Sequence, residues 1–124
     1  MEITAAKLRY LLTISELEQD SDRRVRCIDI AVRLGVARPS ACRMLAAFSE
    51  EGLLSRDKSA GIRLTAQGRE LVSRYEEEYK KLSRYFQSIL SLSEFDAREC
   101  AMALLVAAPD SSRSALCANL PSLP

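Results

Sequence analysis

Apolar residues recur at helical spacing along most of the chain, and the spacing changes once, near the middle. In residues 3–18, leucine and isoleucine recur at near-helical intervals, which predicts an amphipathic first helix. The polar stretch 19–24 ends this helix. Asp29 is expected to cap a short second helix that ends at Gly35, since glycine readily adopts the left-handed conformation after a helix, and Val36 is expected to be buried in the turn.

A third helix and a β-hairpin are predicted next. Proline is tolerated in the first turn of a helix, so the third helix is expected to begin at Pro39 and Ser40 and to end near Glu51. Two short strand-like runs, 53–57 and 62–64, then flank a polar, glycine-containing segment. This pattern is typical of a hairpin.

Three further helices are predicted after the hairpin. Thr65 is expected to cap a long helix over about 65–90 with a continuous apolar stripe. Ser93 is expected to cap a helix over roughly 94–107, whose early acidic residues suit the positive end of the helix dipole. A last short helix is expected over 111–119.

This order of elements is that of a winged helix-turn-helix, which we expect in residues 1–66. Ala31 is small where two helices must cross closely, and Gly35 permits the tight turn between them. Leu45 and the turn valine fill the core, and the signature Leu64-Thr65-x-x-Gly68 follows the hairpin. The expected fold class is therefore mainly α, with a winged helix-turn-helix DNA-binding domain followed by a helical region in 67–124.

A winged helix that binds DNA presents the start and outward face of its third helix to the major groove. The candidate DNA-binding residues on this helix and on the hairpin are Arg38, Pro39, Ser40, Cys42, Arg43, Arg56, Lys58, Ser59 and Arg63. Arg43 can donate two parallel hydrogen bonds to guanine, or it can contact phosphate alone. The hairpin charges suit phosphate or the minor groove, or they are simply solvated.

The charge distribution supports this interpretation more than the net charge of +1 does. Between Ser21 and Arg74 there are eleven Lys or Arg residues against six Asp or Glu, and elsewhere seven against eleven. A basic middle segment suits a surface that faces a duplex. The chain has no histidine base and no glycine-rich phosphate loop, so an enzyme is not expected.

Four widely spaced cysteines and the absence of histidine exclude a Cys/His zinc finger. Free thiols are expected in the cytoplasm, which is the default location because the start of the chain lacks the features of a secretory signal and no apolar run could span a bilayer. Cys42 has two interpretations. It is a small apolar filler, or a thiol made oxidisable by nearby arginines.

The chain resembles the iron- and manganese-dependent repressors, the family of the diphtheria toxin repressor. The resemblance rests on segment 10–18, the helix-turn-helix, the signature that ends at Gly68, and segment 99–104, which replaces one that normally ends in Glu-His. It implies a homodimer, formed through the helices after the hairpin, on a pseudo-palindromic operator. The dimerisation residues it implies are Tyr75, Tyr79, Leu82, Phe86, Leu90 and Leu104. The aromatic residues of the long helix are expected to form a packed face, the alternative being a ligand cage.

The chain departs from this family at the regulatory metal site. The residues at the matching positions are Arg9, Leu12, Tyr79, Ala103 and Leu104, with Cys100 as the one possible ligand that remains. A single thiolate cannot hold Fe²⁺ or Mn²⁺, which prefer several oxygen and nitrogen ligands. We therefore expect no metal and no other cofactor.

The expected function is that of a DNA-binding transcriptional regulator, a repressor by resemblance. Its expected partners are double-stranded DNA and a second copy of the chain, with no membrane and an unknown effector. Two alternatives stay open. One is a winged-helix adaptor that contacts proteins, and the other is a regulator of the multiple-antibiotic-resistance type.

Overall fold

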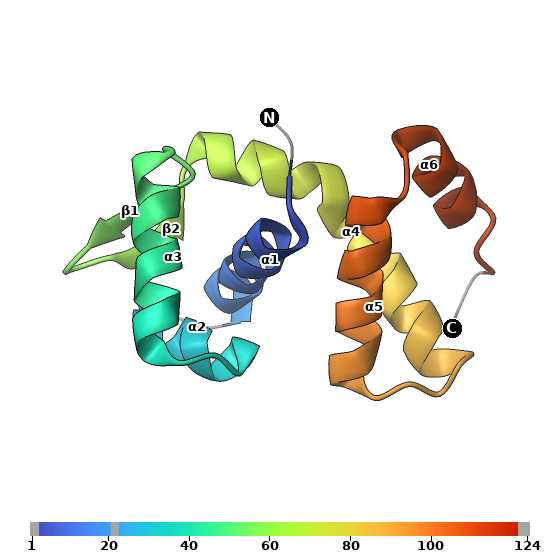
Figure 1. Ribbon diagram of the computed structural model, residues 1–124, viewed down its shortest axis with the longest axis horizontal. Helices are drawn as coiled ribbons and strands as arrows, with labels where there is room; N and C mark the ends of the chain where they lie inside the picture. The colour runs from blue at the N-terminus through green and yellow to red at the C-terminus, as the bar shows by residue number, and fades with distance from the viewer. Residues whose placement is uncertain (1–2, 21–22, 122–124) are drawn as a thin grey trace. The chain divides into compact units, whose positions relative to one another are not determined.

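The structure is a computed structural model that describes residues 3–20 and 23–121, and the chain divides into two compact units (Figure 1). One unit is Arg9–Ser73. The other combines, among the described residues, 3–8 with 74–121.

The unit Arg9–Ser73 contains most of helix α1 (Ala5–Asp20) and the start of helix α4 (Ala66–Ser88). Between them lie helices α2 (Cys27–Leu34) and α3 (Arg38–Glu50) and an antiparallel hairpin of β1 (Leu54–Asp57) and β2 (Gly61–Leu64). The winged helix-turn-helix predicted from the sequence is confirmed.

Helix α2 begins three residues earlier than predicted from the sequence. Its N-cap is Arg26, and Asp29 lies at the third helical position, where its Oδ2 accepts a hydrogen bond of 2.8 Å from the backbone N–H of Arg26. The prediction that Asp29 is the cap was therefore wrong. The early start has a distant cause, because Val25 is held in an extended conformation by the hairpin: its carbonyl accepts from the N–H of Ile62 at 2.8 Å.

The turn between α2 and α3 forms as predicted. Gly35 adopts a left-handed conformation with φ of 68°, and the N–H of Val36 returns to the carbonyl of Ala31 at 3.0 Å. Val36 is only partly buried, so its predicted burial in the turn was overstated. Helix α3 starts at Arg38, one residue before the predicted Pro39, with the proline in its first turn.

The core of this unit is apolar and continuous through α1, α2, α3 and the hairpin. The buried side chains are Tyr10, Leu11, Leu12, Ile14, Ile30, Ala31, Leu34, Ala41, Leu45, Phe48, Leu53, Leu54, Ile62 and Leu64. The rings of Tyr10 and Phe48 meet edge to face, with centroids 5.7 Å apart, which joins α1 to α3. The third helix is thereby fixed in the unit along one face.

The remaining helices are α4 (Ala66–Ser88), α5 (Glu94–Ala107) and α6 (Asp110–Ala118). The predicted caps are confirmed: the Thr65 Oγ1 accepts from the N–H of Gly68 at 3.1 Å, and the Ser93 Oγ accepts from the N–H of Asp96 at 3.1 Å. The long helix ends two residues before the predicted limit. The apolar stripe predicted over 65–90 would extend to Ile89 and Leu90, but these lie beyond the helix and are about half exposed.

Within the second unit, Arg113 joins α6 to α4. Arg113 donates from Nε to Glu78 Oε1 at 2.8 Å and lies over the ring of Tyr75, with the guanidinium carbon 4.8 Å from the ring centroid. The apolar core here contains Tyr79, Leu82, Ala97, Ala101, Met102, Leu105 and Cys117. In the described part of the chain, no helix combines the length and apolar character needed to cross a membrane.

Candidate nucleic-acid interface

Helix α3 has two faces of different character. Ala41, Leu45 and Phe48 are buried against the rest of the winged helix. Arg43 lies on the opposite side, Arg38 lies in the first turn of the helix, and both are exposed to solvent. The helix therefore keeps a fixed orientation while its first turns present two guanidinium groups outward.

The other candidates on this helix take different positions. Pro39 is exposed, and Ser40 is half-buried, with its Oγ 3.5 Å from Nη2 of Arg43. Cys42 is half-buried, and its sulfur points toward α2. The structure thus places Cys42 beside the exposed face and directs its side chain away from that face.

The hairpin presents the predicted polar residues to solvent. Arg56, Lys58, Ser59 and Arg63 are all exposed. The turn is closed by Asp57, whose Oδ1 accepts from the N–H of Ser59 at 2.6 Å. The carboxylate of the turn is occupied in holding the backbone, so the basic side chains project from a defined loop.

Two basic residues near the hairpin were not among the sequence candidates. Arg24 donates from Nη1 to the carbonyl of Lys58, which ties the segment before α2 to the tip of the hairpin. Arg26 is exposed at the start of α2. Only their place in the basic segment 21–74 could have indicated them, because their position beside the hairpin depends on the long-range bridge from Val25.

These residues line an open groove of about 790 Å³ between the start of α2, helix α3 and the hairpin. Its charged lining residues are Arg24, Arg26, Arg56, Asp57 and Lys58. Four cations against one carboxylate, which is already bonded to backbone, make the groove strongly basic. Such a surface attracts a polyanion.

Two cysteines meet on the wall of this groove. The sulfur atoms of Cys27 and Cys42 are 2.7 Å apart, and the Cys27 sulfur also lies 3.9 Å from the carbonyl oxygen of Arg38. Burial, and next the neighbouring Cys42, raise the pKa of the Cys27 thiol to about 11, while Arg38 and Arg56 oppose the rise. No local sequence pattern indicates this contact, because the two residues are fifteen positions apart.

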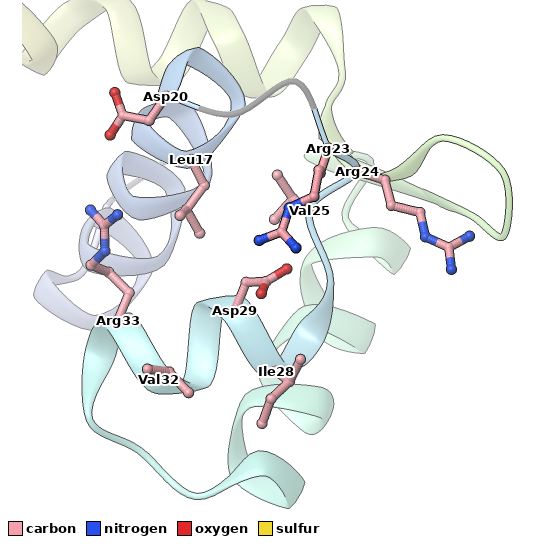
Figure 2. A pocket seen from close by; sticks show the side chains of 9 residues that line it. All are labelled: Leu17, Asp20, Arg23, Arg24, Val25, Ile28, Asp29, Val32 and Arg33. Atoms are coloured by element: carbon pink, nitrogen blue, oxygen red, sulfur yellow. The ribbon is translucent and has the colours of Figure 1, made fainter.

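A second hollow of about 480 Å³ lies on the outer side of α2 (Figure 2). It combines apolar side chains from α1 and α2 with charged ones, and Figure 2 shows Arg23 and Asp29 pointing toward each other across it. Val32 projects beside it with 73% of its surface exposed. The mixed lining distinguishes this hollow from the basic groove.

The predicted dimerisation residues fall into two groups. Tyr79 and Leu82 are 4% and 1% exposed, so they contribute to the core of their own chain. Tyr75, Phe86 and Leu104 are half-buried, and Leu90 is 52% exposed. Phe95, which was not a candidate, is 58% exposed.

The positions that match the family's metal ligands do not fit a divalent cation. Leu12, Ala103 and Leu104 have no donor atom, and Arg9 carries a positive charge. The Tyr79 Oη accepts a hydrogen bond of 2.8 Å from Nε of Arg98, which places a guanidinium beside the one oxygen of the set. Among residues 3–20 and 23–121, no three His, Cys, Asp or Glu side chains are grouped so as to hold a metal.

Two comparisons support the winged-helix fold: one with a sequence family and one with solved structures. The IclR helix-turn-helix domain matches residues 19–58, which span the end of α1, the helix-turn-helix and the first strand. No curated protein sequence matches the chain. The sequence match is thus confined to the part that contains the basic groove.

Solved structures match almost the whole chain. The manganese regulator SloR superposes with a TM-score of 0.75 at 25% identity, over 99% of this chain and 57% of its own. IdeR of T. acidophilum gives 0.71 at 17% identity, over 93% and 53%. A hypothetical protein from Sulfolobus solfataricus gives 0.62 at 18% identity, over 98% and 99%.

The chain spans somewhat more than half the length of the two regulators and nearly all of the Sulfolobus protein. The match to the regulators continues beyond the winged helix, since more than nine-tenths of this chain superposes on each of them. The resemblance inferred from the sequence is confirmed at the level of the fold: the chain has a winged-helix fold similar to that of the manganese regulator SloR and of IdeR.

Proposed function

We propose that this protein is a transcriptional regulator that binds double-stranded DNA through α3 and the hairpin. One observation carries the proposal: α3 buries one face in the core and leaves Arg38 and Arg43 exposed next to a basic groove. A helix held in this way can enter the major groove while the hairpin contacts the adjacent phosphates. No catalytic group is required, and the protein acts by occupying its site.

The base-reading role falls to Arg43, and the positioning role to the hairpin cations. Arginine can donate two hydrogen bonds to the O6 and N7 atoms of guanine, which distinguishes that base from the others. Arg56, Lys58 and Arg63 contact phosphates, which adds affinity without sequence information. Binding should therefore weaken steeply with added salt.

The regulator acts as a homodimer on a pseudo-palindromic operator. Support comes from the apolar side chains that the second unit leaves exposed around the end of α4 and the start of α5, namely Ile89, Leu90 and Phe95. Exposed apolar groups gathered in one region are typical of an interface between proteins. Replacing Leu90 and Phe95 with glutamate should yield a monomer in analytical ultracentrifugation.

Metal does not control this protein. SloR is a manganese regulator by name, but the positions that match the family's ligands carry arginine, leucine and alanine here. Such residues supply no oxygen or nitrogen ligand for Fe²⁺ or Mn²⁺. The effector must act elsewhere.

The test is a selected-oligonucleotide binding profile of the purified protein, with and without Mn²⁺ and Fe²⁺. We expect a symmetric sequence motif, unchanged by either metal. The double variant Arg38→Ala, Arg43→Ala should lose at least tenfold in affinity, about 1.4 kcal/mol, for that motif. Arg84→Ala on α4 removes an exposed arginine outside the groove and should bind as the wild type does.

Two results would overturn the proposal. A tenfold rise in affinity with metal would contradict the loss of the sensor. Failure to select any duplex, or binding insensitive to salt, would favour a winged-helix adaptor that contacts proteins instead.

A further inference from the structure

The two cysteines on the wall of the basic groove are placed for covalent chemistry with each other. Their sulfur atoms are 2.7 Å apart, about 0.65 Å more than the S–S bond of about 2.05 Å in a disulfide. One sits in the first turn of α2 and the other in the second turn of α3, so both backbones are held by the helix-turn-helix core. A small movement of either side chain is enough to join them.

We infer that Cys27 and Cys42 form a redox-active pair that a hydroperoxide oxidises to a disulfide between α2 and α3, which weakens the binding of DNA. The effect on DNA rests on the proposed function, whereas the formation of the disulfide does not. The pair is a modification site in the groove wall, distinct from the exposed arginines that face the duplex.

The reaction begins at Cys42. Because the pKa of Cys27 is raised to about 11, that sulfur keeps its proton and can donate it toward the Cys42 sulfur. The Cys42 thiolate attacks one oxygen of the hydroperoxide, the O–O bond breaks, and Cys42 becomes a sulfenic acid as an alcohol or water leaves.

Cys27 then completes the bond. Its sulfur loses a proton and attacks the Cys42 sulfur, the S–O bond breaks, and the hydroxyl leaves as water. In sum, two thiols and one hydroperoxide give one disulfide, one alcohol (or water) and one water, and the sulfur atoms pass two electrons to the peroxide. The oxidant enters from solvent, since both cysteines line an open groove.

The new bond directly affects α3, the helix proposed to enter the major groove. The Cys27 sulfur is 3.9 Å from the carbonyl of Arg38, the first residue of α3, and Cys42 lies one turn further along. Forming the S–S bond removes the thiol hydrogen of Cys27 that faces this carbonyl and ties the start of α2 covalently to α3. The first turn of α3, which carries Arg38, loses that contact and its freedom to adjust to the duplex.

The full-length protein permits a direct chemical test, because trypsin should leave each cysteine in its own peptide. Cys27 falls in 27–33 and Cys42 in 34–43, while Cys100 and Cys117 fall in 99–113 and 114–124. We expect one equivalent of hydrogen peroxide to link peptides 27–33 and 34–43, and dithiothreitol to release them. A matched control protein with Cys100→Ser and Cys117→Ala should behave in the same way.

The single variants test the order of the steps. Cys27→Ser should leave a sulfenic acid at Cys42 that a dimedone probe traps, whereas Cys42→Ser should leave Cys27 unreacted at neutral pH. Absence of the link between peptides 27–33 and 34–43 in the oxidised wild-type protein, or a link through Cys100 in its place, overturns the inference.

The effect of the disulfide on DNA binding is measured with the duplex found in the selected-oligonucleotide binding profile. Oxidation should lower the affinity of the wild-type protein at least fivefold and reduction should restore it, while Cys27→Ser should show no such reversible change. An unchanged affinity in a protein shown to be fully cross-linked overturns the coupling to DNA. If the reduced protein selects no duplex, the proposed function fails, and the peptide map still decides the chemistry of the pair.

Discussion

Gly68 offers the sharpest test of how the winged helix is held together, because two physical effects predict opposite signs there. Gly68 lies in the first turn of α4. A Cβ atom at this position would lie 2.1 Å from the carbonyl oxygen of Leu53 and 3.3 Å from Cδ2 of Leu64. Ordinary contacts of such a carbon begin at 3.4 Å, so α4 and the chain before β1 would have to separate by about 1 Å.

The expected change in the free energy of unfolding follows from the contacts that this separation weakens. Helix propensity alone favours alanine over glycine by about 1 kcal/mol. Against this, overpacking costs about 1 to 3 kcal/mol. The shift also weakens the hydrogen bonds from the N–H of Thr65 to Leu53 (3.1 Å) and from the Thr65 hydroxyl to Gly52 (2.6 Å), each of which contributes about 1 kcal/mol. Gly68→Ala should therefore lower the free energy of unfolding by about 2 to 3 kcal/mol.

Urea unfolding followed by far-ultraviolet circular dichroism measures this difference. Gly35→Ala is the matched control, since a Cβ there meets nothing within 4 Å but the residue keeps a φ of 68°. That control should cost about 1 kcal/mol, the price of a left-handed conformation for alanine. If Gly68→Ala proves as stable as the wild type, or more stable, the close approach of α4 to the carbonyl of Leu53 does not exist in the folded protein.

Three further predictions concern stability. The hydroxyl of Thr13 is buried and finds no hydrogen-bond partner among the described residues. Thr13→Val should therefore raise the free energy of unfolding by about 1 kcal/mol in urea titrations. A lower free energy of unfolding in this variant would show that the hydroxyl is hydrogen-bonded. Arg113→Met should lower it by about 2 kcal/mol, because Glu78 would keep a mostly buried charge without its partner, and the additional change Glu78→Gln should recover part of that loss. The raised pKa of Cys27 means that the folded protein holds this proton more tightly than the unfolded chain, so its contribution to stability is present below pH 9.0 and declines toward pH 11. Thermal unfolding across this range should show a smaller decline in Cys27→Ser than in the wild type, and equal declines would contradict the shift.

Local chemistry explains which elements the sequence could predict. Thr65 and Ser93 begin α4 and α5 because their side-chain oxygens accept from backbone N–H groups three residues later. Gly35 ends α2 because it adopts a positive φ without strain. These signals act within a few residues, so the sequence alone contains them.

The features that the sequence missed depend on distant contacts. Helix α2 starts at Cys27, before the Asp29 cap that was predicted, because the hairpin holds Val25 in an extended conformation. The same bridge brings Arg24 to the tip of the hairpin. The contact between Cys27 and Cys42 likewise requires the packing of α2 on α3, which no local pattern specifies.

Periodicity identified the buried face of α4 but not the partner that covers it. Tyr79 and Leu82 were predicted to face a second chain, yet they are buried within their own chain. A stripe of apolar residues at helical spacing indicates that one face of the helix is buried. Whether its cover comes from the same chain or from another depends on α5 and α6, whose packing the spacing does not reveal.

The position of Leu12 connects the proposed loss of the metal site with the inferred cysteine pair. Leu12 matches a metal-ligand position of the family, and here it is 1% exposed in the core of the unit that carries α3. Burying a leucine side chain contributes about 1.5 to 3 kcal/mol, so this position now stabilises the winged helix directly. A DNA-binding unit that is stable without a metal would occupy its operator at all times unless another signal moves α3. Among the described residues of that unit, Cys27 and Cys42 connect α2 to the first turns of α3. Their inferred disulfide can be formed by an oxidant from solvent and broken by a reductant, because both cysteines line the open groove.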